Sequence, residues 1–245
     1  MHPKLTLATM RRVLTQLLHD PRTIGLMFVV PCVLLGLLAW MYQSTPHMFD
    51  RVGPALLGIF PFVVMFLITS VATLRERSSG TLERLMALPI GKFDFILGYA
   101  LAFGLLAVVQ ATLASEIAIH VYGMHVAGPE YLVLVVALAD ALLGMALGLF
   151  VSAFARTEFQ AVQFLPALIL PQFLLCGLLV AVDALPGFLH GVARCLPLTY
   201  AVDAMGKVSA QANIPHAAYH DILVVVAFGA AALMLGAATL RRSSR

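Results

Sequence analysis

Long runs of apolar residues, separated by short polar stretches, dominate the chain from about residue 24 to residue 240. Six of these runs are long enough to cross a bilayer, because crossing a hydrocarbon core of roughly 30 Å takes about 20 helical residues. The runs cover approximately residues 24–42, 53–74, 95–119, 131–154, 159–182 and 221–240. The pattern therefore predicts an all-α integral membrane protein, in which one domain over residues 1–245 contains six transmembrane helices.

The residues before the first run have a different pattern. Apolar side chains recur at helical spacing with basic and polar side chains between them, at Leu7, Met10, Leu14, Leu17 and Leu18. This pattern predicts an amphipathic helix over residues 4–20 that lies in the membrane interface. Asp20-Pro21 ends it, because the residue before a proline is pushed out of the α conformation.

A charged segment, residues 75–91, separates the second and third runs. It contains Arg75, Glu76, Arg77, Glu83 and Arg84. A charge at the centre of a bilayer costs about 2.5–3.5 kcal/mol, so this segment cannot lie in hydrocarbon. We expect a short helix outside the bilayer, where a soluble protein can bind it.

The composition supports lipid as the main solvent of the chain. Hydrophobic residues make up 61% and charged residues 11%, whereas soluble domains have about 25% charged residues. If the N-terminus is cytoplasmic, only Arg51, Arg194 and Lys207 of the 15 lysine and arginine residues lie outside. This distribution obeys the positive-inside rule. We expect both termini to be cytoplasmic, and the first span to be retained rather than cleaved as a signal peptide.

Glycine and proline have specific positions within the spans. Gly144 and Gly148 form a G-x-x-x-G motif in the fourth span, which lets two helix backbones approach closely, either within the chain or between subunits. Four prolines lie inside spans and are expected to bend them, either as plain packing or as points that flex during transport: Pro31, Pro61, Pro166 and Pro171.

Two acidic residues lie in apolar surroundings. Asp140 is in the fourth span with no lysine or arginine near it in sequence. It is either a functional residue that faces the bundle interior or a wet cavity, or a protonated acid that hydrogen-bonds a neighbouring helix. Glu116 lies near the outer end of the third span, one turn before His120, and is interpreted as an interface residue. Both are candidates for the transport path.

Catalytic and metal chemistry find no support in the sequence. His216 and His220 are four residues apart beside Asp221, but the chain contains no H-E-x-x-H motif and no Cys/His cluster. No phosphate loop and no nucleophile elbow occur either. We therefore expect no metal site, no catalytic residue and no nucleotide bound by this chain.

Three blocks of sequence carry a family resemblance. The first ends in His19-Asp20-Pro21. The second, Glu76 to Ile90, is E-R-S-S-G-T-L-E-R-L-M-A-L-P-I, and the third joins residues 170–190 to L-P-L-T-Y-A-V-D-A-M at residues 196–205. On these motifs the chain resembles the membrane subunit of an ABC-2 type exporter, the family of bacterial drug, polyketide and polysaccharide export permeases. The third block departs from the family pattern at four positions: Cys176 for serine, Val180 for proline, Leu196 for asparagine and Met205 for arginine.

The resemblance implies a role for the segment 75–91. In such exporters the corresponding loop forms a coupling helix that docks in a cleft of the ATPase subunit. Gly80 would begin the turn, Leu82, Leu85 and Leu88 would present an apolar stripe to a groove, and Pro89 would end the helix. The full set of expected coupling residues is Glu76, Gly80, Thr81, Leu82, Glu83, Arg84, Leu85, Leu88 and Pro89, with Glu76, Glu83 and Arg84 as rim charges.

The resemblance also implies that residues 183–207 form short helices that re-enter the outer leaflet. Pro186 and Pro197 suit the turns of such a segment, since irregular backbone at that depth must be buried in protein. The residues expected to matter there are Asp183, Pro186, Pro197, Tyr200 and Asp203.

The function expected from the resemblance is that of a permease subunit in an ATP-driven exporter of the bacterial inner membrane. A second permease, identical or paralogous, and two ABC ATPase subunits would be its partners, with ATP and Mg²⁺ bound by the ATPases and no nucleic acid involved. Because only 9% of the residues are aromatic, the cargo is expected to be a hydrophobic small molecule, such as a drug or antibiotic, rather than a sugar chain. A lipid or lipid-linked glycan is the alternative. A proton-coupled secondary transporter that uses Asp140 and Glu116 is the candidate from another class.

Overall fold

The computed structural model describes residues 3–79 and 92–239, and within these ranges it contains helices and no strand. Six helices or continuous helical runs are long and apolar enough to cross a membrane, which confirms the all-α class and the number of spans. Four of them are single helices: α2 (Pro21–Met41), α3 (Pro46–Ser78), α6 (Glu130–Val151) and α11 (His216–Thr239). In the third span, Phe95–Val121, α5 (Lys92–Glu116) continues into the π-helix η1 (Ile117–Val121). The fifth span, Glu158–Leu175, runs from α7 to α8.

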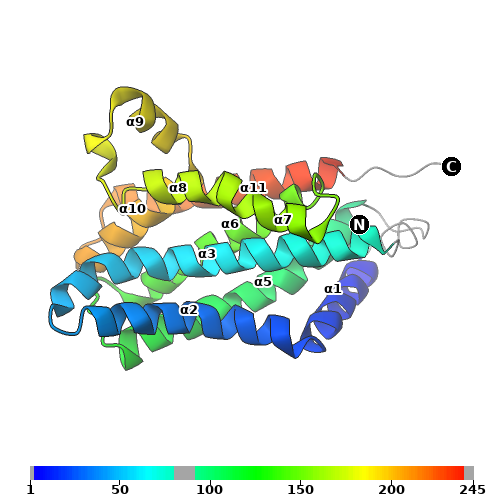
Figure 1. Ribbon diagram of the computed structural model, residues 1–245, viewed down its shortest axis with the longest axis horizontal. Coiled ribbons are helices and arrows are strands. Elements are labelled where there is room, and N and C mark those ends of the chain that lie inside the picture. The colour runs from blue at the N-terminus through cyan, green and yellow to red at the C-terminus, as the bar shows by residue number, and fades with distance from the viewer. Residues whose placement is uncertain (1–2, 80–91, 240–245) are drawn as a thin grey trace.

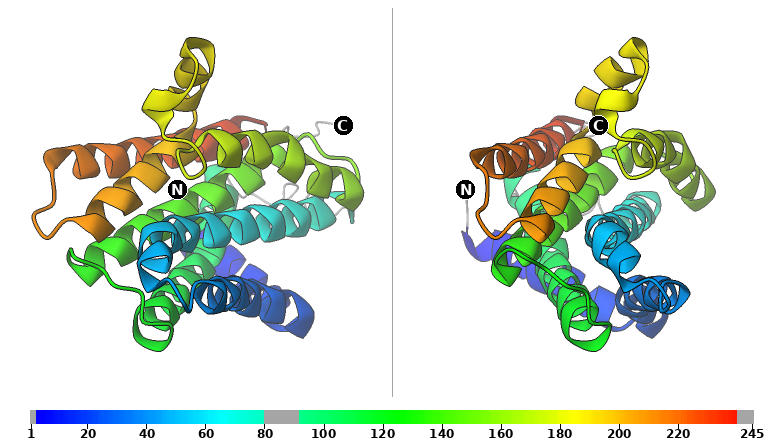
Figure 2. Two further views of the ribbon diagram at one scale, coloured as in Figure 1. Left: turned by 60° about the vertical axis from the view of Figure 1, so that its left-hand side comes forward. Right: turned by 90° about the vertical axis from the view of Figure 1, so that its left-hand side faces the viewer.

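The long helices lie side by side in one elongated bundle (Figure 1). The N-terminal helix α1 (Pro3–Leu18) lies obliquely at one end of the bundle, the end at which α3 and α11 also finish. This is called the α1 end below. The short helix α9 (Gly187–Arg194) lies toward the opposite end in Figure 1, which is called the α9 end, and it projects from the bundle in each of the views in Figures 1 and 2.

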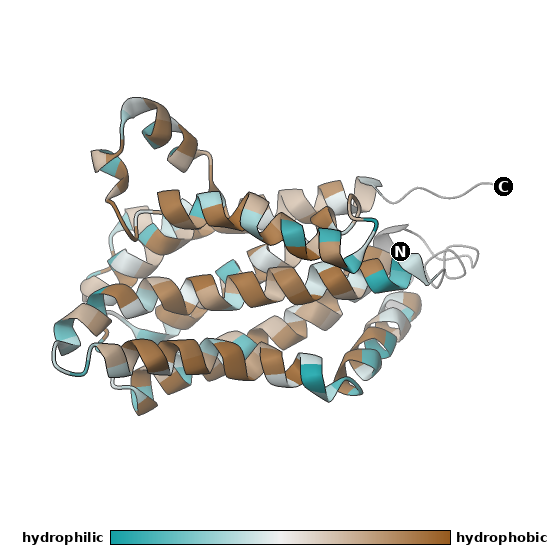
Figure 3. Cartoon of the chain, viewed as in Figure 1, coloured by the Kyte–Doolittle hydropathy of each residue, from teal (hydrophilic) through white to brown (hydrophobic). Residues whose placement is uncertain are grey.

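Hydrophobic residues cover the long helices along most of their length, and hydrophilic residues gather toward the two ends of the bundle (Figure 3). Many large apolar side chains on the bundle surface are exposed, for example Val29 and Leu37 of α2 and Leu170 of α8. A water-soluble protein would bury such a surface, whereas lipid tails are a suitable solvent for it.

The centre of the bundle is the contact between α3 and α6, which is the most extensive helix pair among the described residues. The two helices touch through glycine. A Cβ atom built on Gly144 would lie 2.2 Å from the backbone oxygen of Phe62, and one built on Gly148 would lie 2.5 Å from that of Phe66. The G-x-x-x-G motif therefore packs within the chain. We call this line of contact the α3–α6 seam.

The fifth span is not a uniform α-helix. α7 (Glu158–Phe164) passes through a π-helical turn, η2 (Leu165–Ile169), into α8 (Leu170–Leu175). Pro166 lies inside this turn, where its missing N–H removes a helix hydrogen bond. The predicted span continued to residue 182, whereas α8 ends at Leu175, because Gly177 adopts a φ of 95° that a right-handed helix cannot contain.

The segment between the fifth and sixth spans forms three short helices at the α9 end. They are η3 (Val182–Ala184), α9 and α10 (Pro197–Ala210). α10 packs against α3, α6 and α11, so it is part of the bundle, whereas α9 projects from the bundle and contacts it through α8 and α10. How deeply this segment, or α1, lies in a membrane stays a prediction.

Candidate functional site

A cavity of about 540 Å³ opens near the α1 end of the bundle, where α1, α2, α3, α5 and α7 converge. Its volume is in the range of small-molecule sites. The deeper wall is aliphatic and includes Leu26 and Val30 of α2 and Val64 and Ile68 of α3. Polar side chains line the part closest to the end of the bundle: Gln16, Asp20, Thr23, Arg75, Glu76, Tyr99 and Glu158. The cavity is therefore amphipathic along its length.

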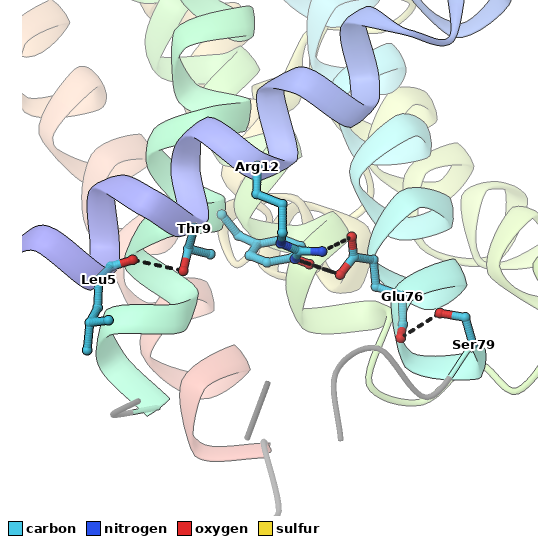
Figure 4. A network of polar contacts seen from close by, with 6 residues as sticks. Leu5, Thr9, Arg12, Glu76 and Ser79 are labelled. Atoms are coloured by element: carbon cyan, nitrogen blue, oxygen red, sulfur yellow. Dashed lines mark hydrogen bonds and ion pairs between the residues drawn. The ribbon is translucent and has the colours of Figure 1, made fainter. Parts of the chain in front are cut away.

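A polar network joins three helices beside this cavity (Figure 4). Arg12 of α1 donates from Nη1 to Glu76 Oε1 at 3.0 Å and from Nη2 to Glu76 Oε2 at 2.8 Å. Arg12 Nη2 also donates to the hydroxyl of Tyr99 on α5 at 2.8 Å, and that hydroxyl donates to Glu76 Oε2. The side chains of Arg12 and Glu76 are only 28% and 13% exposed. The network thus fixes α1 to the end of α3 and to α5.

Burial and hydrogen bonding act in opposite directions on the pKa of Arg12. Burial lowers the pKa, but the hydrogen bond to Glu76 and the charge of that carboxylate raise it, and the net pKa is above the ordinary arginine value. The guanidinium is therefore charged at every physiological pH.

A second ion pair at the same end connects α3 to α7. Arg75 donates from Nε and Nη2 to the two carboxylate oxygens of Glu158 at 2.8 and 3.0 Å. Both side chains are about half exposed, at 55% and 51%, so solvent weakens the attraction. Asp20, which caps α2, accepts hydrogen bonds from the backbone and hydroxyl of Thr23 at 3.3 and 2.7 Å.

The expected coupling residues fall mostly outside the described part of the chain. Of that set the structure describes Glu76 alone. The others lie beyond the described residues: Gly80, Thr81, Leu82, Glu83, Arg84, Leu85, Leu88 and Pro89. The structure gives Glu76 an internal partner, since its carboxylate is bound by Arg12 and Tyr99 instead of being free at the rim of a docking surface.

A larger cavity, of about 720 Å³, lies at the α9 end. Charged side chains of both signs line it: Arg51, Asp183, Arg194, Asp203, Lys207 and Asp221. Lys207 Nζ of α10 donates to Asp203 Oδ2 at 2.7 Å and to Asp221 Oδ2 of α11 at 2.6 Å. Burial lowers the pKa of Lys207, but the two hydrogen bonds outweigh it, and the net pKa is above the ordinary lysine value.

Three of the five residues expected to matter in the segment 183–207 line this cavity, namely Asp183, Tyr200 and Asp203. Asp183 lies 3.5 Å from Arg194, and Tyr200 donates its hydroxyl to the backbone oxygen of Arg194 at 2.8 Å. Pro186 immediately precedes α9, and Pro197 is the first residue of α10. The contacts hold α9 and α10 together, while a role in transport for these residues stays a prediction.

The structure separates the two acidic candidates for the transport path. Asp140 is wholly buried within the bundle, and neither of its oxygens has a hydrogen-bond partner among the described residues. Glu116 is 60% exposed and lies 3.2 Å from His120, at the end of α5. Neither residue lines the two cavities described above.

Sequence reasoning missed the partners of several charged residues, namely Arg12 with Tyr99, Arg75 with Glu158, and Lys207 with Asp221. One signal was available for Lys207, because Asp203 precedes it by four residues on the same helix. Arg12 and Tyr99 are 87 residues apart in the sequence, and Arg75 and Glu158 are 83 residues apart, so no local pattern connects either pair.

Comparison with known proteins agrees with this architecture. A family model described as ABC-2 type transporter matches residues 4–208. The chain is 31% identical over 159 residues to "ABC transporter G family member 20" of Dictyostelium discoideum, a match over 65% of this chain and 22% of that protein.

Two bacterial relatives match a longer part of the chain. "Probable multidrug ABC transporter permease YbhS" of Escherichia coli (strain K12) is 24% identical over 193 residues, which are 78% of this chain and 51% of that protein. "Linearmycin resistance permease protein LnrN" of Bacillus subtilis (strain 168) is 24% identical over 185 residues, which are 74% of this chain and 47% of that protein. The chain thus spans about half, or less, of the length of these curated relatives.

Proposed function

Because the chain belongs to the ABC-2 type transporter family, we propose that it is the transmembrane permease subunit of an ATP-driven exporter of hydrophobic small molecules, such as drugs or antibiotics. The names of the two bacterial relatives, a multidrug permease and a linearmycin resistance permease, support this cargo class. The structural observation that carries the proposal is the amphipathic cavity at the α1 end.

The cavity suits a cargo with an apolar body and a polar group. Its aliphatic wall can bury the apolar body, which contributes roughly 25 cal/mol per Å² of surface removed from water. Its polar part, around Arg75 and Glu158, can hydrogen-bond a polar group. With the α1 end in the cytoplasm, as the distribution of lysine and arginine favours, such a cargo enters from the cytoplasm or the inner leaflet of the bacterial inner membrane.

ATP supplies the energy on a separate subunit. α3 ends at Ser78, so its last residues begin the block from Glu76 to Ile90 that resembles a coupling helix. Two cytoplasmic ABC ATPases bind ATP and Mg²⁺ and dock on this segment, one for each permease subunit. Their closure moves the segment and the end of α3 with it, while this chain itself binds no nucleotide and catalyses no reaction.

A second permease subunit, identical or paralogous, completes the path. Among the six spans, α2 and the run from α7 to α8 have the smallest fraction of residues buried inside the chain. Their apolar surfaces, for example Leu37 of α2 and Leu174 of α8, are available for a partner subunit.

The docking of the ATPase is tested by Leu82→Asp. The chain is purified in detergent with the candidate ATPase, and both co-purification and ATP hydrolysis are measured. An acid in the apolar stripe is expected to abolish co-purification, because a desolvated, unpaired carboxylate opposes binding. The matched control is Phe188→Asp, which places the same acid on an 83% exposed apolar residue at the α9 end.

The control is expected to bind the ATPase like the wild-type chain. Equal loss in both variants would indicate a general effect of the acid on folding. Full binding by Leu82→Asp would contradict docking through this segment, and failure of the wild-type chain to bind an ATPase would contradict the ATP-driven mechanism.

A further inference from the structure

Asp140 has the most enclosed carboxyl group in the described part of the chain. Its side chain is wholly buried on α6, and both oxygens lack a hydrogen-bond partner among the described residues. Gly58 of α3 faces it: a Cβ atom built on Gly58 would lie 3.1 Å from Asp140 Oδ2 and 3.7 Å from Met205 Cε of α10. The carboxyl is therefore enclosed where α3, α6 and α10 meet.

The position of Asp140 extends the α3–α6 seam by one turn. Asp140 precedes Gly144 by four residues, and Gly58 precedes Phe62 by four residues, so both pairs occupy the same faces of their helices. At Gly144 the seam is closed by backbone contact with Phe62. At Asp140 the absence of a side chain on Gly58 leaves the space that the carboxyl fills.

The groups able to stabilise a charge on this carboxyl have other partners. On α10 and α11, Lys207 gives its hydrogen bonds to Asp203 and Asp221. The thiol of Cys176, the titratable neighbour that interacts with Asp140, donates to the backbone oxygen of Phe173 at 3.1 Å.

α3 offers no compensating charge either. Its nearest charged residues toward the α9 end, Asp50 and Arg51, precede Gly58 by about two helical turns. An ionised carboxylate in apolar surroundings, without a counter-charge or a hydrogen-bond donor, is strongly unfavourable, and the group takes up a proton instead. The closed seam therefore requires the neutral acid.

We propose that Asp140 is a proton-binding site that is occupied while the α3–α6 seam is closed and is emptied when the seam opens to water. On opening, the O–H bond breaks, water accepts the proton as hydronium, and the carboxylate remains. On closing, the carboxylate takes the proton back. Each permease subunit then binds and releases one proton per opening. This goes beyond ATP-driven export and does not depend on the identity of the cargo.

The experiment is infrared spectroscopy of the purified chain in lipid vesicles at neutral pH. A protonated carboxyl has a carbonyl stretching band that an ionised carboxylate lacks, and the band shifts when deuterium replaces the proton. The wild-type chain is expected to show this band, Asp140→Asn to lack it, and the control Glu116→Gln, which removes an exposed carboxyl, to keep it. The absence of the band from the wild-type chain, or its persistence in Asp140→Asn, would overturn the proposal.

Transfer to deuterated buffer tests the link to opening. In the wild-type chain the band is expected to shift slowly, because water must wait for the seam to open. Gly144→Ala forces the seam apart and is expected to speed the shift about tenfold or more, while the control Gly25→Ala, where a Cβ meets no atom within 4 Å, leaves the rate unchanged. A shift complete on mixing, or an equal rate in all three proteins, would show that the seam does not protect the proton.

Neither measurement needs the ATPase or a cargo. Failure of this proposal therefore leaves the exporter proposal untouched, and the reverse is also true.

Discussion

Gly144 determines how closely two helices of the bundle can approach. Gly144→Ala is expected to lower the free energy of unfolding by at least about 2 kcal/mol, because the new Cβ would lie 2.2 Å from the backbone oxygen of Phe62, which cannot rotate away. Thermal unfolding in detergent measures the effect. Gly25→Ala is the control and should be neutral or slightly stabilising, since alanine favours helix over glycine. Equal midpoints for the two variants would contradict the close contact.

Lys207 makes the stability of the α9 end depend on pH. Its folded-state pKa is raised above the ordinary value, so the ion pairs contribute fully at neutral pH and are lost as the pH rises through the raised pKa. Lys207→Met is therefore expected to be less stable than the wild-type chain at pH 7, and the difference should shrink in strongly alkaline buffer. Unfolding midpoints across this range measure it, and a difference that grows with pH would have the wrong sign.

Between elements, the two ion pairs at the α1 end should differ in strength. Arg12→Ala leaves the mostly buried Glu76 without its cation and is expected to cost about 1–3 kcal/mol. Arg75→Ala breaks a half-exposed pair with Glu158 and should cost less than about 1 kcal/mol. Thermal unfolding measures the cost of each variant. Double mutants in which the partner carboxylate, Glu76 or Glu158, is removed as well separate the energy of each ion pair from the other effects of losing the arginine. Equal costs would mean that burial does not control these contacts.

The elements were largely predictable from sequence because each span is a local pattern. The six apolar runs and the G-x-x-x-G motif depend only on neighbouring residues. The end of the fifth span at Leu175 was not predictable in this way, because Gly177 and the residues after it are also apolar and continue the run. Hydropathy records solubility in lipid, and it does not record the backbone conformation that ends a helix.

At the scale of the whole molecule, the amphipathic cavity should control transport. Ile68→Trp, which enlarges a side chain in the cavity wall, is expected to reduce cargo-stimulated ATP hydrolysis several-fold without reducing ATPase binding. The matched control is Val135→Trp on the exposed surface of α6, which should leave both unchanged. If both drug-like and lipid cargo still stimulated ATP hydrolysis fully in Ile68→Trp, the cargo path would lie elsewhere in the protein.

The candidate site was less predictable than the fold. Asp140 was recognisable as an acid in an apolar run, yet its contact with Gly58 joins residues far apart in the chain. The cavity at the α1 end depends on five helices, and the pairing of Arg12 with Glu76 spans 64 residues. Such sites form where different helices pack together, and the sequence pattern of one helix does not show which residues of another helix it will contact.

The uninterrupted length of α3 has a mechanical consequence. α3 continues for 17 residues beyond Pro61 to Ser78, a distance of about 26 Å at 1.5 Å per residue. Pro61 lacks one backbone hydrogen bond and is therefore the natural place for the helix to bend. A bend of about 10° there would displace Ser78 by about 4–5 Å, close to the rise of one helical turn. Phe62 and Phe66, which contact Gly144 and Gly148, lie on the Ser78 side of Pro61. A bend at Pro61 therefore requires the α3–α6 seam to separate, so that movement of Ser78 and opening of the seam are mechanically coupled.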